Sequence, residues 1–483
     1  MIEKFKMKYN NMPVQVKASL WFLICSFLQK GISMLTTPIF TRLLTTEEYG
    51  QFNVFFSWNG IITIFVSLNL SYGVYTQGLI RYEDDRTVFS SSLQGLSTVL
   101  ITSWTLTYCI FKEFFNDLFG LSTIQMVAML LMIWTSAVFG FWASEQRVLY
   151  KYRMLVIISI LVSLAKPILG IFLVTRYNDR VTARILGLLL VEVIGYTGMY
   201  IVQMYRGKVF FSKKYWLYAL AFNIPLIPHY LSQTVLNNSD RIMISSMVGN
   251  SEAGIYGLAY SLANIMILFN NALSQTINPW LYKKIKERKI DEISPVAYFS
   301  LMIIASVNLL LILIAPEAVA IFAPKSYYEA IYIIPPVAMS VYFLYSYDLF
   351  AKFAFYYEKT KFIMLASVVG ALTNIVLNYI FINIFGYKAA GYTTLVCYII
   401  YCIGHYLFMN KVCDQCCDGV RPYSLKKIMG ITIPFVVIGF LLLLTYNHII
   451  VRYIIIVATL IICIINRKAL TDIVKNVMDV KKK

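Results

Sequence analysis

The chain has few charged side chains, and acidic ones are the scarcest among them. Charged residues make up 14% of its 483 residues, whereas roughly 25% is usual in a soluble globular protein. Hydrophobic residues make up 59%, and the mean hydropathy is +0.68. This composition excludes an ordinary soluble domain and favours a polytopic membrane protein.

Motifs that mark common enzymes are also missing. The sequence contains no GxxxxGK[ST], HExxH or GxSxG motif and no convincing pair of acidic residues. Cys413, Cys416 and Cys417 form a CDQCC segment, but no second cysteine or histidine pair lies nearby to complete a zinc site. We therefore expect a protein that is not an enzyme and that holds no metal or cofactor.

Long apolar segments dominate what is present. A run of about 17–25 apolar residues crosses a hydrocarbon core. Such runs predict fourteen spans, at approximately 18–40, 49–71, 88–111, 119–143, 154–175, 185–204, 217–238, 254–280, 296–315, 330–350, 362–384, 389–409, 429–446 and 449–466. We therefore expect an all-α polytopic membrane protein with about 14 transmembrane helices.

Basic residues orient these spans. The formal net charge is +18, and with a cytoplasmic N-terminus 31 of the 42 Lys and Arg residues fall in cytoplasmic segments and 9 on the opposite side. The positive-inside rule then places both termini in the cytoplasm. The basic balance indicates topology rather than a nucleic-acid partner, and the loops and the tail up to Lys483 can also contact membrane lipids.

One stretch of sequence occurs twice, 204 residues apart. TEEYGQFNVFFSWNGI begins at Thr46 and SEAGIYGLAYSLANI begins at Ser251, so that Glu48 matches Glu252 and Gly187 later matches Gly391. Six spans separate the copies, and this even number makes the halves parallel repeats. We expect an N-terminal lobe (1–205, spans 1–6), a C-terminal lobe (206–410, spans 7–12) and an appendage (411–483, spans 13–14 and a basic cytoplasmic tail).

Polar residues follow helical spacing in four of the spans. They lie on one face of spans 1, 2, 7 and 8, at equivalent places in both halves. The members that we expect to line a cavity between the lobes are Ser26, Ser33, Thr37, Gln233, Asn237, Asn264 and Asn271. The alternative is that these small and polar residues only hold neighbouring helices together.

Several cations lie in or near the spans and outnumber the deep acids. They are Lys30, Arg241, Lys166, Arg42 and Arg81. Lys30 lies too deep to reach the interface easily, so it contacts either an anionic substrate or a carboxylate such as Glu192. Arg241 could instead pair with Asp240, and Arg42 and Arg81 could be interfacial. A cationic cavity favours a phosphate-bearing substrate.

Two further residues are candidates for ion coupling. Glu192 is the chief deep acid of the first lobe, and a structural salt bridge is its alternative role. His229 lies near Pro225 and Pro228, which we expect to break span 7, and such breaks mark moving or cavity-facing segments of transporters.

Two segments resemble the first part of each lobe in the polysaccharide-biosynthesis flippases that export O-antigen, capsule and teichoic-type repeat units. They are residues 30–58 (KGISMLTTPIFTRLLTTEEYGQFNVFFSW) and residues 237–265 (NNSDRIMISSMVGNSEAGIYGLAYSLANI). The resemblance covers about four-fifths of the chain. It implies the V-shaped fold of the multidrug/oligosaccharidyl-lipid/polysaccharide exporter superfamily, in a bacterial cytoplasmic membrane. It also implies that an undecaprenyl-pyrophosphate-linked oligosaccharide is flipped from the cytoplasmic to the outer leaflet by alternating access, with a polysaccharide polymerase and a chain-length regulator as partners.

Three other functions stay open on the sequence. A cation-coupled multidrug exporter of the same superfamily is expected to show a buried carboxylate in the first lobe, where span 1 offers Lys30 instead. A lipid II flippase is a second relative. A membrane-embedded polysaccharide polymerase fits the hydropathy but normally needs a large outer loop, and none here exceeds about 15 residues.

Overall fold

The structure is a computed structural model that describes residues 9 and 12–465 of the chain. These residues are mostly helical and contain no strand, which confirms the predicted all-α class. The predicted basic tail beyond residue 465 lies outside the described residues. By packing, the chain divides into two compact units that meet between Asn238 and Ser239.

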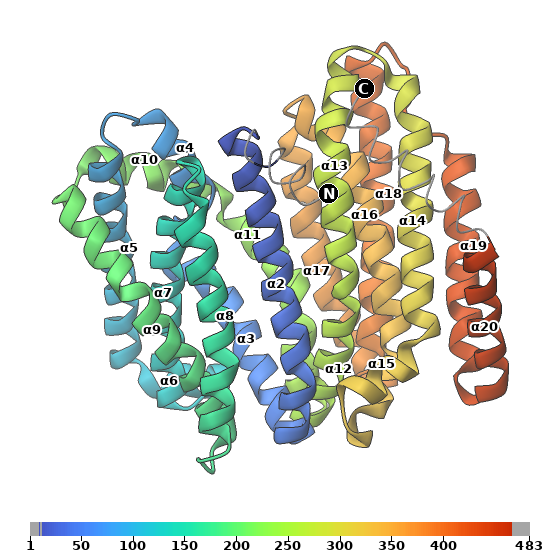
Figure 1. The fold of residues 1–483 in the computed structure, drawn as a ribbon, viewed down its shortest axis with the longest axis horizontal. Helices are drawn as coiled ribbons and strands as arrows, with labels where there is room; N and C mark the ends of the chain where they lie inside the picture. The colour runs from blue at the N-terminus through green and yellow to red at the C-terminus, as the bar shows by residue number, and fades with distance from the viewer. Residues whose placement is uncertain (1–8, 10–11, 466–483) are drawn as a thin grey trace. The chain divides into compact units, whose positions relative to one another are not determined.

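Each unit is built from long helices joined by short connections (Figure 1). The first unit holds α2 (Val14–Leu43), α3 (Thr46–Ser67), α4 (Gly73–Arg81), α5 (Arg86–Ile110), α6 (Lys112–Phe119), α7 (Thr123–Val148), α8 (Tyr152–Val174), α9 (Arg180–Gly207) and α10 (Lys213–Asn223). The boundary falls within α11 (Ile227–Met247). The second unit holds α12 (Asn250–Ala263), α13 (Ile265–Lys286), α14 (Ile293–Leu313), α15 (Ala315–Phe322), α16 (Ile334–Tyr356), α17 (Thr360–Phe385), α18 (Ala389–Cys416), α19 (Leu425–Leu444) and α20 (Ile449–Ile465).

The apolar helices make this a multi-pass membrane protein. Within the described residues, nine helical segments are long and apolar enough to cross a membrane. The 3-10 segment η3 (Lys325–Tyr332) and α16, bent by 47°, add a tenth if they form one span. Three predicted spans fail this criterion because their helices are too polar or too short. These spans are 49–71, 88–111 and 217–238, which coincide with α3, α5 and the α10–α11 pair. The last predicted span, at α20, is also short. The count of fourteen therefore stays a prediction.

Helices that lie about 204 residues apart correspond to each other. The helix α3 begins at Thr46 and α12 at Asn250, and the short α6 corresponds to the short α15. Glu48 and Glu252 both lie in the first turn of their helices, where a carboxylate favours the helix dipole. The contact of α7 with α9 recurs between α16 and α18. The repeat is thus visible in the packing, whereas the lobe limits at residues 205 and 410 stay a prediction.

A close approach of two helices sets the geometry of the first unit. The helix α9 packs against α3, α5, α7 and α8. A Cβ atom added to Gly187 on α9 would lie 2.9 Å from the Cα atom of Gly170 on α8, so only glycine permits this crossing. Because the two helices run antiparallel, Lys166, one turn before Gly170, faces Glu192, just over one turn after Gly187.

The predicted break in span 7 is confirmed. The helix α10 ends at Asn223, a 3-10 turn covers Ile224–Leu226, and α11 begins at Ile227. Pro225 lies inside that turn and Pro228 in the first turn of α11, where a missing backbone N–H is tolerated.

Candidate functional site

The first unit contains a pocket of about 290 Å³ between α2, α3, α8 and α9. Its wall combines cationic and neutral polar side chains with phenylalanine rings. The polar lining residues are Gln29, Ser33, Thr36, Ser163, Lys166 and Arg184. The pocket therefore brings together Ser33, which was predicted to line a cavity, and Lys166, which was predicted to bind the substrate.

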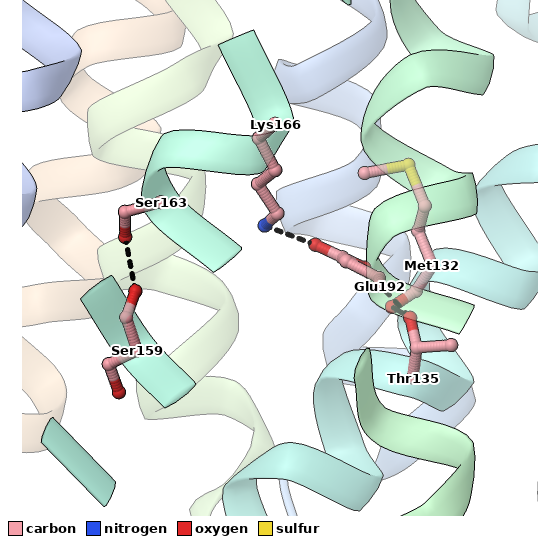
Figure 2. A network of polar contacts seen from close by, with 6 residues as sticks. All are labelled: Met132, Thr135, Ser159, Ser163, Lys166 and Glu192. Atoms are coloured by element: carbon pink, nitrogen blue, oxygen red, sulfur yellow. Dashed lines mark hydrogen bonds and ion pairs between the residues drawn. The ribbon is translucent and has the colours of Figure 1, made fainter. Parts of the chain in front are cut away.

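Lys166 is held by a buried carboxylate at the edge of this pocket (Figure 2). Its Nζ atom donates to Oε1 of Glu192 at 2.6 Å, and the hydroxyl of Thr135 donates to Oε2 at 2.7 Å. The side chain of Glu192 is 6% exposed and that of Lys166 is 27% exposed. Each oxygen of the Glu192 carboxylate thus has a hydrogen-bond donor. The lysine keeps access to the pocket.

This pairing corrects one alternative from the sequence, because Glu192 binds Lys166 and not Lys30. The side chain of Lys30 is instead exposed on α2. The deciding factor is the α8–α9 crossing, which spacing along a single helix does not reveal. A structural role for Glu192 gains support, and its role in ion coupling stays a prediction.

Arg184 is the second cation of the pocket, and the sequence analysis missed it. Its guanidinium carbon lies 3.5 Å from the ring centre of Phe52 and 3.9 Å from that of Phe40. Aromatic ring faces attract the positive charge of a guanidinium, so these two rings stabilise Arg184 in the wall of the pocket. The available signal was an arginine immediately before the predicted span 185–204, but its aromatic partners come from α2 and α3.

The remaining predicted cations lie elsewhere. Arg42 is exposed and donates to the carbonyl oxygen of Pro38 at 2.8 Å. Arg81 ends α4, with its guanidinium carbon 5.4 Å from the ring centre of Tyr218. Arg241, in the second unit, lies 4.3 Å from the ring centre of Tyr260.

The predicted polar residues are divided between the two units. Ser26 and Thr37 donate to main-chain oxygens of α2. Asn237 donates to the main-chain oxygen of Gln233 on α11, and Asn264 separates α12 from α13. Asn271 is exposed and lines a second pocket of about 370 Å³, formed by α13 and α16.

His229 lies near the start of α11 and faces the ring of Tyr230. Its Nδ1 atom is buried and has no hydrogen-bond partner within the described part of the chain. Its proposed coupling role stays a prediction.

The second unit buries a carboxylate that the sequence analysis treated only as a neighbour of Arg241. Asp240 is 1% exposed. Its Oδ1 accepts from Asn378 at 2.6 Å, and its Oδ2 accepts from Tyr256 at 2.5 Å and from Thr394 at 2.9 Å. These donors come from α12, α17 and α18, so Asp240 ties three helices to α11. Among the described residues, no group of three or more His, Cys, Asp or Glu could hold a metal ion.

Residues 16–284, more than half of the chain, match the family described as "Polysaccharide biosynthesis protein". The chain belongs to the polysaccharide biosynthesis protein family. Residues 225–380 of this family member also match the MatE family, so the predicted resemblance is confirmed.

Relatives of this family member include "Lsg locus putative protein 1" of Haemophilus influenzae. That protein is 26% identical over 374 residues, which cover 74% of this chain and 88% of the relative. An uncharacterized membrane protein of Methanocaldococcus jannaschii is 24% identical, over 79% of this chain and 94% of the relative.

Solved structures share the fold of the chain. The structure "Lipid II flippase MurJ, inward closed conformation" superposes with a TM-score of 0.66 at 15% identity, covering 90% of this chain and 99% of that one. An inward-facing multidrug resistance MATE family transporter of the MOP superfamily gives a TM-score of 0.60 at 14% identity, over 79% and 94% of the two chains. At these identities the likeness establishes the exporter-superfamily fold.

Proposed function

We propose that this protein is a flippase that moves undecaprenyl-pyrophosphate-linked oligosaccharide repeat units from the cytoplasmic to the outer leaflet by alternating access. The repeat units would serve the assembly of capsule, O-antigen or exopolysaccharide in the cytoplasmic membrane of a bacterium. The membership of the polysaccharide biosynthesis protein family supports this class of substrate. The observation that carries the proposal is the cationic pocket of the first unit, with Lys166 and Arg184 in its wall.

The pocket has the chemistry that a pyrophosphate requires. A lysine supplies a compact charge with three donors, and an arginine supplies a planar set of donors that fits phosphate oxygens. Gln29, Ser33 and Thr36 add neutral donors on α2. Glu192 offsets one of the two positive charges, so the lining keeps an excess of positive charge. Lys30 and Arg241 stay proposed contacts of the substrate.

The ion pair allows a test that separates binding from folding. A buried pair can be replaced by apolar residues of similar size without loss of stability. In the double variant Lys166→Met with Glu192→Leu, we expect folded protein that has lost most of its transport. The measurement is the transfer of a headgroup-labelled undecaprenyl-pyrophosphate-linked oligosaccharide across proteoliposome membranes.

A matched control comes from a buried ion pair that lines neither pocket. Arg452 donates to Glu317 at 2.5 Å, and its side chain is 4% exposed. The variant Arg452→Met with Glu317→Leu should keep normal transport. Full transport by the Lys166 and Glu192 double variant would remove the pyrophosphate assignment, and no transport by the wild-type protein would reject the flippase proposal.

The same assay distinguishes the alternatives. A lipid II flippase would move labelled lipid II in preference to the oligosaccharide-linked lipid. A multidrug exporter would move a cationic dye instead, although a pocket with excess positive charge disfavours cations. A polymerase would lengthen the saccharide rather than transfer it.

A further inference from the structure

The pocket of the second unit has a different lining from the cationic pocket. On α13 the residues Asn271, Ser274, Gln275 and Asn278 occupy one face, at spacings of three and four residues. Asp348 and Lys352 from α16 close the other side. Its volume of about 370 Å³ lies within the range of small-ligand sites.

Two amide oxygens in this wall have no hydrogen-bond partner among the described residues. They are Oδ1 of Asn270 and Oδ1 of Asn278. Asn270 is only 3% exposed, and its Nδ2 atom donates to the carbonyl oxygen of Val341 at 2.9 Å. That bond fixes the amide orientation and leaves the oxygen as an acceptor. A buried acceptor without a donor is costly, so a donor from outside the chain is expected here.

The charged groups of the pocket neutralise each other. Lys352 donates to Oδ1 of Asp348 at 2.7 Å, and Ser274 donates to Oδ2 at 3.2 Å. The side chain of Lys352 is 12% exposed and that of Asp348 is 29% exposed. The lining therefore has no excess charge for an anion, in contrast to the Lys166 and Arg184 pocket.

Amides, a carboxylate and tyrosine rings together suit a polyhydroxylated ligand. A sugar hydroxyl both donates and accepts, so it can satisfy amide oxygens and amide N–H groups in turn. Tyr345 and Tyr347 also line the pocket, and aromatic rings can pack against the C–H surface of a sugar ring.

We propose that the pocket formed by α13 and α16 binds a saccharide unit of the substrate through its hydroxyl groups. This inference rests on the proposed function, because it assigns the saccharide and the pyrophosphate to separate pockets. Asn278 lies five residues before Lys283, in the cationic last turn of α13. The predicted topology puts that end in the cytoplasm, where the substrate is taken up.

Protection of a cysteine tests this site without measuring transport. In a cysteine-free background, Leu344→Cys puts a thiol in the pocket wall and removes no polar group. We expect at least one of a panel of methyl glycosides (glucoside, galactoside, N-acetylglucosaminide and rhamnoside), at millimolar concentration, to slow labelling by a thiol reagent at least threefold. Inorganic pyrophosphate should give no protection.

Matched variants identify the groups that are responsible. Asn278→Leu in the Leu344→Cys protein should abolish the protection, whereas Asn308→Leu, at a buried asparagine on α14 outside the pocket, should preserve it. Protection by pyrophosphate, or by no glycoside, would overturn the saccharide assignment. The proteoliposome assay tests the flippase proposal independently of this labelling experiment. If the wild-type protein transports the lipid but no glycoside protects the cysteine, only the assignment of the saccharide pocket is rejected.

Discussion

Two buried carboxylates, Glu192 in the first unit and Asp240 in the second, have different hydrogen-bond donors. Glu192 in the first unit is neutralised by the ammonium of Lys166, with one added hydroxyl donor. Asp240 in the second unit receives its hydrogen bonds from the neutral groups of Tyr256, Asn378 and Thr394. Glu192 thus has a directly bonded cation, whereas the three side chains that donate to Asp240 are neutral.

A shift of 204 residues does not carry either network onto the other unit. Adding 204 to Lys166 and Glu192 gives Gly370 and Val396, and subtracting it from Asp240 gives Thr36. The duplication has therefore kept the start of the repeated helix, at α3 and α12, and the contact of α7 with α9 as that of α16 with α18, while the polar groups have diverged. This difference teaches that the fold and the site came under separate constraints, since helix packing tolerates many polar arrangements.

The largest expected effect comes from Asp240→Ala. The substitution removes the shared acceptor and leaves three buried donors unsatisfied, each costing about 1–3 kcal/mol. We expect a large fall in the temperature at which the detergent-purified protein loses its monodisperse peak. Glu192→Ala should cost less, because the half-buried ammonium of Lys166 can turn to water in its pocket. An equal or larger loss for Glu192→Ala would break the comparison.

The sequence predicted the elements of each unit better than the networks within them. Three signals are local in the sequence: the repeat at Thr46 and Ser251, the apolar runs and the two prolines of span 7. They were enough to predict the order of the helices and the break at residues 224–226. The pairing of Lys166 with Glu192 depends on which faces of α8 and α9 meet. The stacking of Arg184 needs rings from two other helices, and no single helical pattern contains that information.

The number of membrane spans is also difficult to predict from the sequence alone. Apolar runs in the sequence predicted spans at α3, α5 and α11, but these helices carry more polar residues than the nine segments that are apolar enough to cross a membrane. Their polar faces become favourable only where a neighbouring helix or water receives them, which is a property of the assembled bundle.

A smaller effect is expected at the matched glycines Gly187 and Gly391. A Cβ atom at Gly187 would meet backbone atoms of Gly170 at 2.9 and 3.0 Å, whereas one at Gly391 would meet the ring of Pro336 at 3.2 Å. Backbone cannot move aside without shifting α8 against α9, so Gly187→Ala should cost about 1–3 kcal/mol and Gly391→Ala less. Thermal unfolding of the two purified variants measures the difference. Equal shifts would show that the two repeats pack with the same tolerance.

The smallest effect concerns the start of the repeated helix. In the first unit Thr45 and Glu48 form a capping box, in which Glu48 accepts from the backbone N–H of Thr45 at 2.8 Å and Thr45 accepts from that of Glu48 at 3.1 Å. The equivalent α12 has Gly249 before it and no side-chain cap. Thr45→Ala should therefore destabilise the protein by about 1 kcal/mol, measured as a small shift in thermal unfolding.

The two halves of the box should also depend on each other. Each side chain holds the backbone in the conformation that the other requires, so the double variant Thr45→Ala with Glu48→Ala should lose less than the sum of the single losses. Glu252→Ala supplies the matched control in the second unit, because Glu252 faces Gly249, which offers no hydroxyl in return. A loss at Glu252 as large as that at Glu48 would mean that the helix dipole, and not the reciprocal cap, is what the duplicated glutamate preserves.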